Sequence, residues 1–364
     1  MNELNLKNMY RLPWSKNDNP NGWLELTTYC QLSCPGCYRG LFKKDAKRFH
    51  EDLQELKKQV NHLIKSRNIQ TISLSGGEPL LYPNLDELIK YIASKKLRIK
   101  IYTNGMNLNK DNLIKFKNIG VTEFIIHIDK SQKRENGSSE KDLNNLRNHY
   151  CNMFRKVKGI NLGFIMPISE DNFQEINEIL NFYKSNADVI NLIVFTCYNG
   201  QINDQYPSKK TPLENISKKV NEIYNCNPVA YLGKLHTKKK ISWLLSFPLI
   251  SNNKTIGEIG KETYKNIQSR YHKKHGRYFI TLKGNKLKPL HLFKLFGFSK
   301  ALKLFLRSFN NPVRSQVILI IDSPEKNKYG WEICESCPDA MVYKDRLVPS
   351  CLLERIKKGE KISI

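Results

Sequence analysis

Long apolar runs are missing from this sequence of 364 residues. Its longest apolar stretch, residues 241–250, is interrupted by serines and a proline, whereas a membrane-spanning helix needs roughly 20 consecutive apolar residues. Residues 1–20 are polar and lack the apolar centre of a secretory signal. Apolar residues still make up 40% of the chain, enough for a large core. We therefore expect a cytoplasmic globular protein.

Acidic residues are scarce, and one segment has none. The chain has 60 Lys and Arg against 34 Asp and Glu, and its formal net charge is +26. Between Thr263 and Ile321 there is no acidic residue, against thirteen Lys and Arg. A genome-wide bias toward lysine would explain scattered lysines but not this local absence of acid. We expect residues 263–321 to contact a membrane surface from its periphery or an anionic ligand, with nucleic acid as a further alternative.

The nine cysteines do not have the distribution of a disulfide framework, and disulfides are rare in cytosolic proteins. Three are isolated, namely Cys151, Cys197 and Cys226. The other six form two groups with short spacing, which is typical of metal ligation. The groups are Cys30, Cys34 and Cys37 near the start, and Cys334, Cys337 and Cys351 near the end.

Strand and helix patterns alternate from residue 23 to residue 195. Strands are expected at 23–28, 71–74, 97–102, 121–128, 159–166 and 189–195, and helices at 45–65, 85–93, 111–118, 139–157 and 172–183. Such alternation predicts a parallel sheet. A closed eight-stranded barrel needs about 250 residues, so six units predict an α/β fold with a partial (β/α)6 TIM-like barrel.

The chain is expected to divide into four parts. Residues 1–20 form an N-terminal extension and residues 21–200 the barrel. Residues 201–325 form a basic region that is mostly irregular over 201–260. Residues 326–364 hold the second cysteine group in an auxiliary iron–sulfur region.

The first cysteine group supplies three thiolates within eight residues, as Cys30-x3-Cys34-x2-Cys37. A [4Fe–4S] cluster is normally held by four thiolates, so three would leave one iron open for a ligand. A ferredoxin would have a fourth cysteine close by, and the next here is Cys151. Zinc is the alternative, but it would need a fourth ligand, for which His50 is the nearest candidate.

Three further motifs follow predicted strands: Ser75-Gly76-Gly77-Glu78-Pro79, Thr103-Asn104-Gly105 and His127-Ile128-Asp129. The ends of parallel barrel strands share one rim, where barrel enzymes place their chemistry. The two glycines would let the backbone approach a ligand closely, and the Glu78 carboxylate suits an ammonium group. Taken alone, the glycine motif is equally consistent with an ordinary strand-to-helix turn.

Together, the three-cysteine loop after the first strand and the Gly-Gly-Glu motif after the second resemble the radical S-adenosylmethionine (SAM) superfamily. The resemblance covers about residues 20–200. It implies that the open iron binds the amino and carboxylate groups of SAM, and that the glycine motif contacts the methionine amino group. SAM would be cleaved to methionine and a 5′-deoxyadenosyl radical that takes hydrogen from a substrate. A reductant such as flavodoxin or ferredoxin would supply the electron.

The resemblance also implies which residues bind the cofactor. They are Gly76, Gly77, Glu78, Pro79, Thr103, Asn104 and Asp129. One position departs from the family pattern, because Gly36 stands where an aromatic residue usually precedes the third cysteine. Tyr38, just after that cysteine, is therefore a further candidate for contact with SAM.

The second group, Cys334-x2-Cys337-x13-Cys351, is similar to the auxiliary [4Fe–4S] cluster of the radical SAM GTP cyclase of molybdenum-cofactor synthesis, and to twitch domains. Arg346 stands where a glycine is common, and the paired C-terminal glycines of the cyclase are absent. The resemblance therefore implies a second cluster but not a GTP substrate. A structural zinc is the alternative, and Cys197 or Cys226 would be candidates for a fourth ligand.

Residues 291–309 combine large apolar and basic side chains at helical spacing. The apolar face is Leu295, Phe298, Leu302, Phe305 and Phe309, and the basic face is Lys300, Lys303 and Arg307. Such a helix can lie in a membrane interface. The alternative is a helix packed on the barrel with its lysines in water.

We therefore expect a radical SAM enzyme with two clusters and a membrane-associated or lipid-like substrate. A peptide-modifying maturase is the next candidate, and a nucleotide-directed cyclase follows. A non-catalytic iron–sulfur electron carrier belongs to a different class. It would predict a fourth cysteine near each group and would not need the Gly-Gly-Glu-Pro motif.

Overall fold

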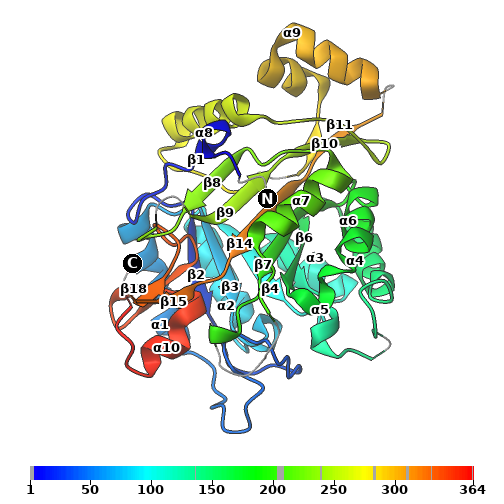
Figure 1. Cartoon of the computed structure of the whole chain (residues 1–364). Helices are drawn as coiled ribbons and strands as arrows, with labels where there is room; N and C mark the ends of the chain where they lie inside the picture. The colour runs from blue at the N-terminus through cyan, green and yellow to red at the C-terminus, as the bar shows by residue number, and fades with distance from the viewer. Residues whose placement is uncertain are drawn as a thin grey trace.

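The computed structural model describes residues 4–135, 137–202, 209–237, 240–281, 284–308, 311–328, 330–362 and 364. Its centre is a curved ten-stranded sheet (Figure 1). In spatial order the strands are β1 (Tyr10–Arg11), β8 (Ala230–Gly233), β9 (Ile241–Ser246), β14 (Val317–Asp322), β7 (Ile190–Cys197), β6 (Asn161–Ile168), β5 (Val121–His127), β4 (Arg98–Thr103), β3 (Thr71–Ser75) and β2 (Asn21–Glu25).

The six strands predicted from the sequence are β2 to β7, and they are parallel neighbours in chain order. The partial TIM-like barrel is thereby confirmed. A seventh parallel strand, β14, pairs with β7 although more than a hundred residues separate them in sequence. Beyond it, β9 runs antiparallel to both β14 and β8, and β1 pairs with β8 in parallel at the edge of the sheet.

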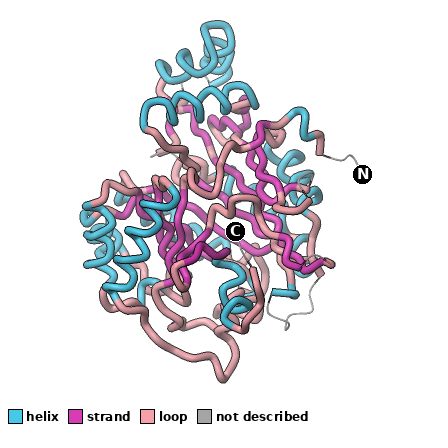
Figure 2. Tube along the Cα trace, turned by 90° about the vertical axis from the view of Figure 1, so that its left-hand side faces the viewer, coloured by secondary structure: helices cyan, strands magenta, loops and turns pink. Residues whose placement is uncertain are grey.

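Helices cover the outer face of the parallel strands (Figures 1 and 2). They are α1 (Leu53–Arg67), α2 (Leu85–Ser94), α3 (Lys110–Ile119), α4 (Asn144–Val157), α5 (Glu170–Phe173), α6 (Ile176–Ser185) and α7 (Leu213–Tyr224). Their apolar sides and the outward side chains of the strands form the main hydrophobic core. Burial of this core is the dominant favourable contribution to folding.

Three helices differ from their predicted bounds, and the one expected at 139–157 begins only at Asn144. The helix expected at 45–65 begins at Leu53, after Asp52 caps it by accepting the Glu55 amide at 3.0 Å. Residues 49–51 instead run beside residues 26–28, where the Thr28 amide donates to the Phe49 carbonyl at 3.0 Å. The helix expected at 172–183 is divided into α5 and α6. Ser169 and Asn172 start α5 as a capping box.

The prediction of an irregular region over 201–260 was wrong. This region contains α7, β8 and β9, together with β10 (Pro248–Ser251) and β11 (Lys254–Glu258). All six residues of β9 are buried, so it lacks the alternation of polar and apolar residues that reveals a strand with one exposed face.

A four-stranded sheet lies at one end of the molecule, with the order β11-β10-β13-β12. Its remaining strands are β12 (Lys286–Leu287) and β13 (Val313–Ser315). The helices α8 (Lys261–His275) and α9 (Pro289–Ser308) lie with it, and α9 stands beyond α8 in both ribbon views (Figures 1 and 2). A second hydrophobic cluster lies between these elements and the large sheet.

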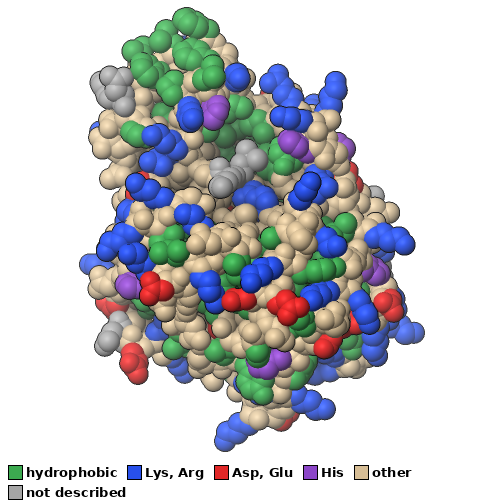
Figure 3. All heavy atoms as spheres, turned by 180° about the vertical axis from the view of Figure 1, so that it is seen from behind, with side chains coloured by type: hydrophobic (Ala, Val, Ile, Leu, Met, Phe, Trp, Pro, Cys, Tyr) green, Lys and Arg blue, Asp and Glu red, His purple; other side chains and the backbone are tan. Residues whose placement is uncertain are grey.

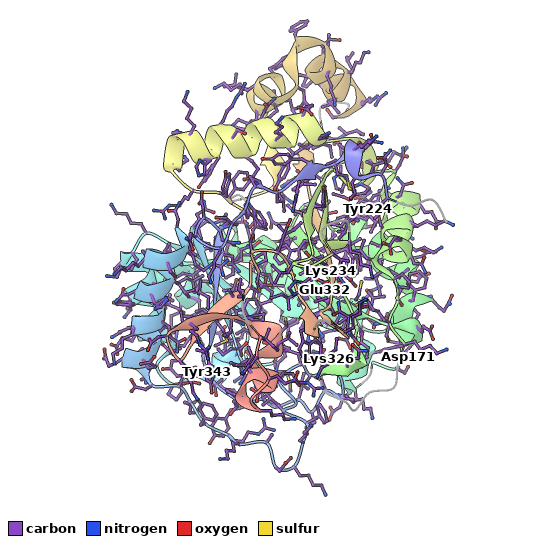
Figure 4. All side chains as sticks on the ribbon, turned by 60° about the vertical axis from the view of Figure 1, so that its left-hand side comes forward. Asp171, Tyr224, Lys234, Lys326, Glu332 and Tyr343 are labelled. Carbon is purple, nitrogen blue, oxygen red and sulfur yellow. The ribbon has the colours of Figure 1, made fainter. Side chains whose placement is uncertain are left out.

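The second cysteine group lies in a C-terminal region of short elements. They are β15 (Glu325–Asn327), β16 (Gly330–Glu332), β17 (Ala340–Tyr343), β18 (Arg346–Pro349), the 3-10 turn η5 (Ser350–Leu352) and α10 (Leu353–Lys357). β15 and β16 form one hairpin, and β17 and β18 form another. Figure 4 labels Lys234 and Glu332 in the middle of the view; there Lys234 forms a β-bridge with Cys334, and the Leu235 amide donates to the Ile333 carbonyl at 2.9 Å.

Among the described helices, none has both the length and the apolarity needed to cross a bilayer.

Candidate active site

The first cysteine group lies in a long loop between β2 and α1. The loop is shaped by backbone hydrogen bonds within it, from the Cys37 amide to the Cys34 carbonyl at 3.0 Å and from the Gly40 amide to the Cys37 carbonyl at 2.8 Å. Arg48 donates to the Thr28 carbonyl at 2.6 Å and so closes the loop on itself. All three cysteines are of intermediate exposure, and none of them is in a disulfide.

Burial raises the pKa of each of these three thiols. Neutral thiols are therefore favoured in the metal-free protein, and binding of a metal would have to displace their protons. Two donors lie near Cys30 Sγ, the Leu32 amide at 3.4 Å and Asn104 Nδ2 at 3.8 Å. Donors of this kind stabilise a metal-bound thiolate.

The glycine pair after β3 fits closely against the start of the cysteine loop. A Cβ atom on Gly76 would lie 2.5 Å from the Thr27 carbonyl oxygen, and one on Gly77 would lie 2.2 Å from that of Tyr29. The Gly77 amide donates to Thr27 at 2.7 Å. These glycines were predicted to admit a ligand; in the structure, their missing side chains admit the neighbouring backbone.

Glu78 connects the ends of two strands. Its side chain is fully buried, and its carboxylate accepts hydrogen bonds from Thr103 Oγ1 at 2.6 Å and from the Asn104 amide at 2.7 Å. The Leu80 amide donates to it at 3.0 Å. Burial raises the pKa of Glu78, and these donors oppose that shift. Glu78 therefore joins the strand ends from outside the cavity and Pro79 is buried beside it, whereas Gly76, Gly77, Thr103 and Asn104 line the cavity.

The end of β5 contributes His127 and Asp129. Asp129 is buried, and its carboxylate contacts His127 Nε2 and accepts from the Ser131 amide at 2.7 Å. The pKa of Asp129 is lowered by His127 and by the Ser131 donors, which outweigh the effect of burial. His127 and Ser131 line the cavity, and Asp129 lies behind them.

Tyr38 lines the cavity, but its hydroxyl donates to Glu25 Oε1 at 2.7 Å. Burial is the main reason that the pKa of Tyr38 is raised well above its usual value. Another aromatic residue, Tyr198 at the end of β7, lies against the position where the family pattern has one. A Cβ atom on Gly36 would lie 3.0 Å from the Tyr198 ring. No sequence signal pointed to Tyr198, because it is distant from the cysteine loop in sequence.

The second cysteine group is built from a turn and the end of a hairpin. Cys334 follows β16, Cys337 lies in a turn with φ +24°, and Cys351 lies in η5 just after β18. Buried Arg67 at the end of α1 donates through Nη2 to the carbonyls of Ser336 and Cys337, at 2.9 and 3.0 Å.

Further contacts join this turn to β2 and to the residues just before it. Asn19 Nδ2 donates to the Ser336 carbonyl at 3.2 Å, and Asn21 Nδ2 donates to Asp339 Oδ1 at 3.0 Å. Burial raises the pKa of Cys334 to about 12 and that of Asp339 to about 6. The second group is therefore enclosed by residues from the other end of the chain.

Both cysteine groups line one cavity of about 330 Å³ inside the partial barrel. Aromatic and aliphatic side chains form much of its wall, namely Trp23, Tyr102, Ile165, Val194, Trp243 and Leu319. Asp322, at the end of β14, brings a carboxylate to the same wall and pairs with Lys234 Nζ at 2.5 Å. Sequence reasoning missed Trp243 and Asp322, because their strands come after the recognised βα alternation.

Cys197 and Cys226, the candidate fourth ligands, belong to the buried apolar core and are absent from the described lining of this cavity. Over the described residues, no three Cys, His, Asp or Glu side chains converge as they would around one metal ion. A four-iron cluster binds each thiolate through a different iron, which needs a wider separation of the thiols than a single ion does.

Residues 24–183 match the model of the Radical SAM superfamily. Among curated proteins, the chain is similar to 7,8-dihydro-6-hydroxymethylpterin dimethyltransferase of Methanocaldococcus jannaschii, with 25% identity over 190 residues. The match covers 50% of this chain and 37% of that protein. Fe-coproporphyrin III synthase of Methanosarcina barkeri is 27% identical over 176 residues, covering 47% and 42% of the two chains.

The sporulation killing factor maturation protein SkfB of Bacillus subtilis is 25% identical, covering 43% of this chain and 38% of its own. The chain therefore spans about two fifths of the length of these relatives. Among solved structures, SuiB of Streptococcus suis bound to S-adenosylmethionine aligns with 16% identity and a TM-score of 0.43. That alignment covers 57% of this chain and 47% of SuiB.

Proposed function

This chain belongs to the radical SAM superfamily through residues 24–183, and from that premise we propose that it cleaves SAM reductively at a [4Fe–4S] cluster. The superfamily uses such a cluster together with SAM. The observation that carries the proposal is the single cavity of about 330 Å³ that both cysteine groups line, together with residues from the ends of β3, β4 and β5.

Cys30, Cys34 and Cys37 would hold the cluster, and their chemistry fits it. Three thiols on a loop that lines the cavity would leave one iron of a four-iron cluster without a protein ligand. When bound, the cluster supplies the electron that cleaves SAM into methionine and a 5′-deoxyadenosyl radical. The chain itself contributes position, hydrogen bonds and exclusion of water.

Each rim residue has a role that follows from its contacts. Gly76 and Gly77 bring the end of β3 to the cavity wall, where the backbone can meet the methionine part of SAM. Glu78 fixes the end of β4 to the end of β3 through Thr103 and Asn104. Asp129 orients His127, which faces the cavity, so we expect His127 to contact the cofactor or the substrate.

Cys334, Cys337 and Cys351 would hold a second cluster on the other part of the cavity wall. A substrate would then lie between the SAM site and the second cluster. The wall beside it is aromatic and aliphatic, through Trp243 and Leu319 among others. Such a wall favours a substrate with an apolar part, because burial of apolar surface drives binding.

A peptide-modifying maturase is the second candidate. The similarity to SkfB, whose name describes a maturation protein, favours it. A nucleotide-directed cyclase is a third candidate, since a probable GTP 3′,8-cyclase of Methanococcus maripaludis is 33% identical over 108 residues. Incubation with GTP and with extracts of apolar metabolites or peptides, followed by mass spectrometry, would distinguish these substrate classes.

The test is anaerobic reconstitution with iron and sulfide, followed by incubation with SAM and dithionite. We expect about eight irons per chain and formation of 5′-deoxyadenosine. Replacement of Cys30, Cys34 and Cys37 by Ala should remove about four irons and all cleavage. Cys151→Ala is the control, because Cys151 lies on the inner side of α4 and is buried in the hydrophobic core. Persistent 5′-deoxyadenosine in the triple variant would contradict the proposal.

A further inference from the structure

The helix α9 carries a surface that the proposed chemistry does not use. It stands at the end of the molecule, beyond α8 and the small sheet (Figures 1 and 2). Its inner side, with Leu292, Ala301 and Leu304, is buried in the second hydrophobic cluster. Gly297, with φ +73°, interrupts the helix and divides it into two segments. α9 thus packs on β11 and α8, through a cluster that also includes residues of the large sheet.

The outer side of α9 exposes large apolar side chains. Phe298 is 73% exposed, Leu306 62% and Leu290 61%, and Leu302 and Phe305 are also exposed. Phe309, predicted to belong to the same face, lies outside the described residues. Single exposed leucines are ordinary on protein surfaces, whereas a concentration on one projecting element indicates a contact site.

Cations accompany this apolar surface. Lys294, Lys300, Lys303 and Arg307 lie on α9 itself, and the stretch from Thr263 to Ile321 contains no acidic residue. Figure 3 shows the arrangement: apolar side chains cover the projecting end, basic side chains lie below them, and acidic side chains gather mainly in the other half of the molecule. The exposed apolar side chains therefore lie at the end of the molecule farthest from the barrel, and basic side chains lie next to them on the barrel side.

A groove runs beside the same helix. It has a volume of about 900 Å³, and its walls include Phe305 and Leu306 of α9 and Ile256 of β11. Lys254 and Arg307 are the charged residues in its described lining, and both are cations. An apolar wall next to two cations suits a ligand with an acyl chain and an anionic head group.

We propose that α9 and this groove dock the protein on the surface of an anionic phospholipid bilayer. The apolar end would enter the interface, and the lysines would lie at the level of the phosphates. Charge complementarity identifies the occupant, because anionic lipid attracts each basic residue near its surface. Nucleic acid would pair with the lysines but would gain little from Phe298 and Leu306 at the exposed end.

The first experiment is flotation of the reconstituted full chain with phosphatidylcholine vesicles, with and without phosphatidylglycerol. We expect binding to the anionic vesicles that weakens as salt increases. Neutralising Lys294, Lys300 and Lys303 to Gln should weaken this binding by about a hundredfold. The matched control neutralises three exposed lysines on the barrel side, Lys110, Lys141 and Lys156, and should bind as the unaltered chain does.

The second experiment locates the contact. Phe298→Trp should show a blue shift on anionic vesicles and quenching by brominated lipid. The four native tryptophans are buried, with exposures of 3–7%, so they should not be quenched. SAM cleavage by each variant is measured in parallel as a check that it is folded, so failure of docking is separable from failure of the proposed chemistry.

Three results would overturn the docking proposal. The first is absence of binding to anionic vesicles. The second is vesicle binding that is unchanged when Lys294, Lys300 and Lys303 of α9 are replaced by Gln, or the absence of quenching in Phe298→Trp. The third is evidence that something other than a bilayer occupies the surface. A second copy of the chain would be indicated by concentration-dependent dimerisation that the double change Phe298→Ser and Leu306→Ser abolishes. Nucleic acid would be indicated by tight binding of an RNA oligonucleotide that the lysine variants abolish, in a protein that does not bind vesicles.

Discussion

The two cysteine groups face the same cavity but are held in different ways. The first lies on a continuous loop whose hydrogen bonds run mostly within it, as from the Cys37 amide to the Cys34 carbonyl. The second depends on residues from the other end of the chain, above all the buried Arg67. The difference indicates that the first site is built locally, whereas the second forms only when the two ends of the chain are joined.

The sharpest test of this comparison removes the thiols of each group in turn. The triple replacement of Cys30, Cys34 and Cys37 by Ala should abolish SAM cleavage. The same change at Cys334, Cys337 and Cys351 should also remove about four irons but leave 5′-deoxyadenosine formation measurable. Iron content and product chromatography check both. Loss of SAM cleavage in the second variant, with four irons retained, would mean that the two sites do not act separately.

Arg39 offers a test of the contact between the two regions. It lies just after the first cysteine group, and its guanidinium pairs with buried Glu25 at 2.5 Å and with Glu354 of α10 at 2.9 Å. Arg39→Met would leave the Glu25 charge buried without its partner, which costs about 3–5 kcal/mol of folding free energy. Denaturant unfolding measures this loss.

The control for Arg39 is the double variant Arg39→Met with Glu25→Gln. It removes the uncompensated charge, so it should recover part of the lost stability. A single variant as stable as the unaltered chain would show that this ion pair does not join the two regions.

Arg67 tests the second group alone. Its two hydrogen bonds to the carbonyls of Ser336 and Cys337 come from a charged donor, so each is worth roughly 1.5–3 kcal/mol. Arg67→Met should therefore loosen the turn and lower reconstituted iron from about eight toward four, with SAM cleavage retained. Arg155→Met is a matched control, because Arg155 is at the surface and pairs with Asp188 at 2.6 Å, away from the described cavity lining. Full iron content in the Arg67 variant would contradict the dependence on this residue.

The sequence predicted the locally encoded parts of the molecule. The six strands β2 to β7 and both cysteine groups could be recognised from spacing and alternation within short windows. The strands β8, β9 and β14 could not be assigned to the sheet, since their pairing joins residues that are distant in sequence. For the same reason the support of the second group by Arg67 had no sequence signal. The site residues themselves stay predictions, as does the assignment of ligands to each cluster.

Replacement of Tyr198 has the smallest expected effect. It tests whether the first cysteine group is held only by residues close to it in sequence. The Tyr198 ring lies against Gly36 and lines the cavity, so one side of the cysteine loop rests on the end of β7. If this ring supplies an aromatic surface for SAM, Tyr198→Leu should raise the KM for SAM about threefold to tenfold, which corresponds to the binding free energy of one aromatic contact. Iron content should not change. Gly36→Ala is the complementary change, because its Cβ would lie 3.0 Å from the ring and push it away. A loss of iron in Tyr198→Leu, with the KM unchanged, would instead show that the ring supports the cysteine loop, and the first site would then share the long-range dependence of the second.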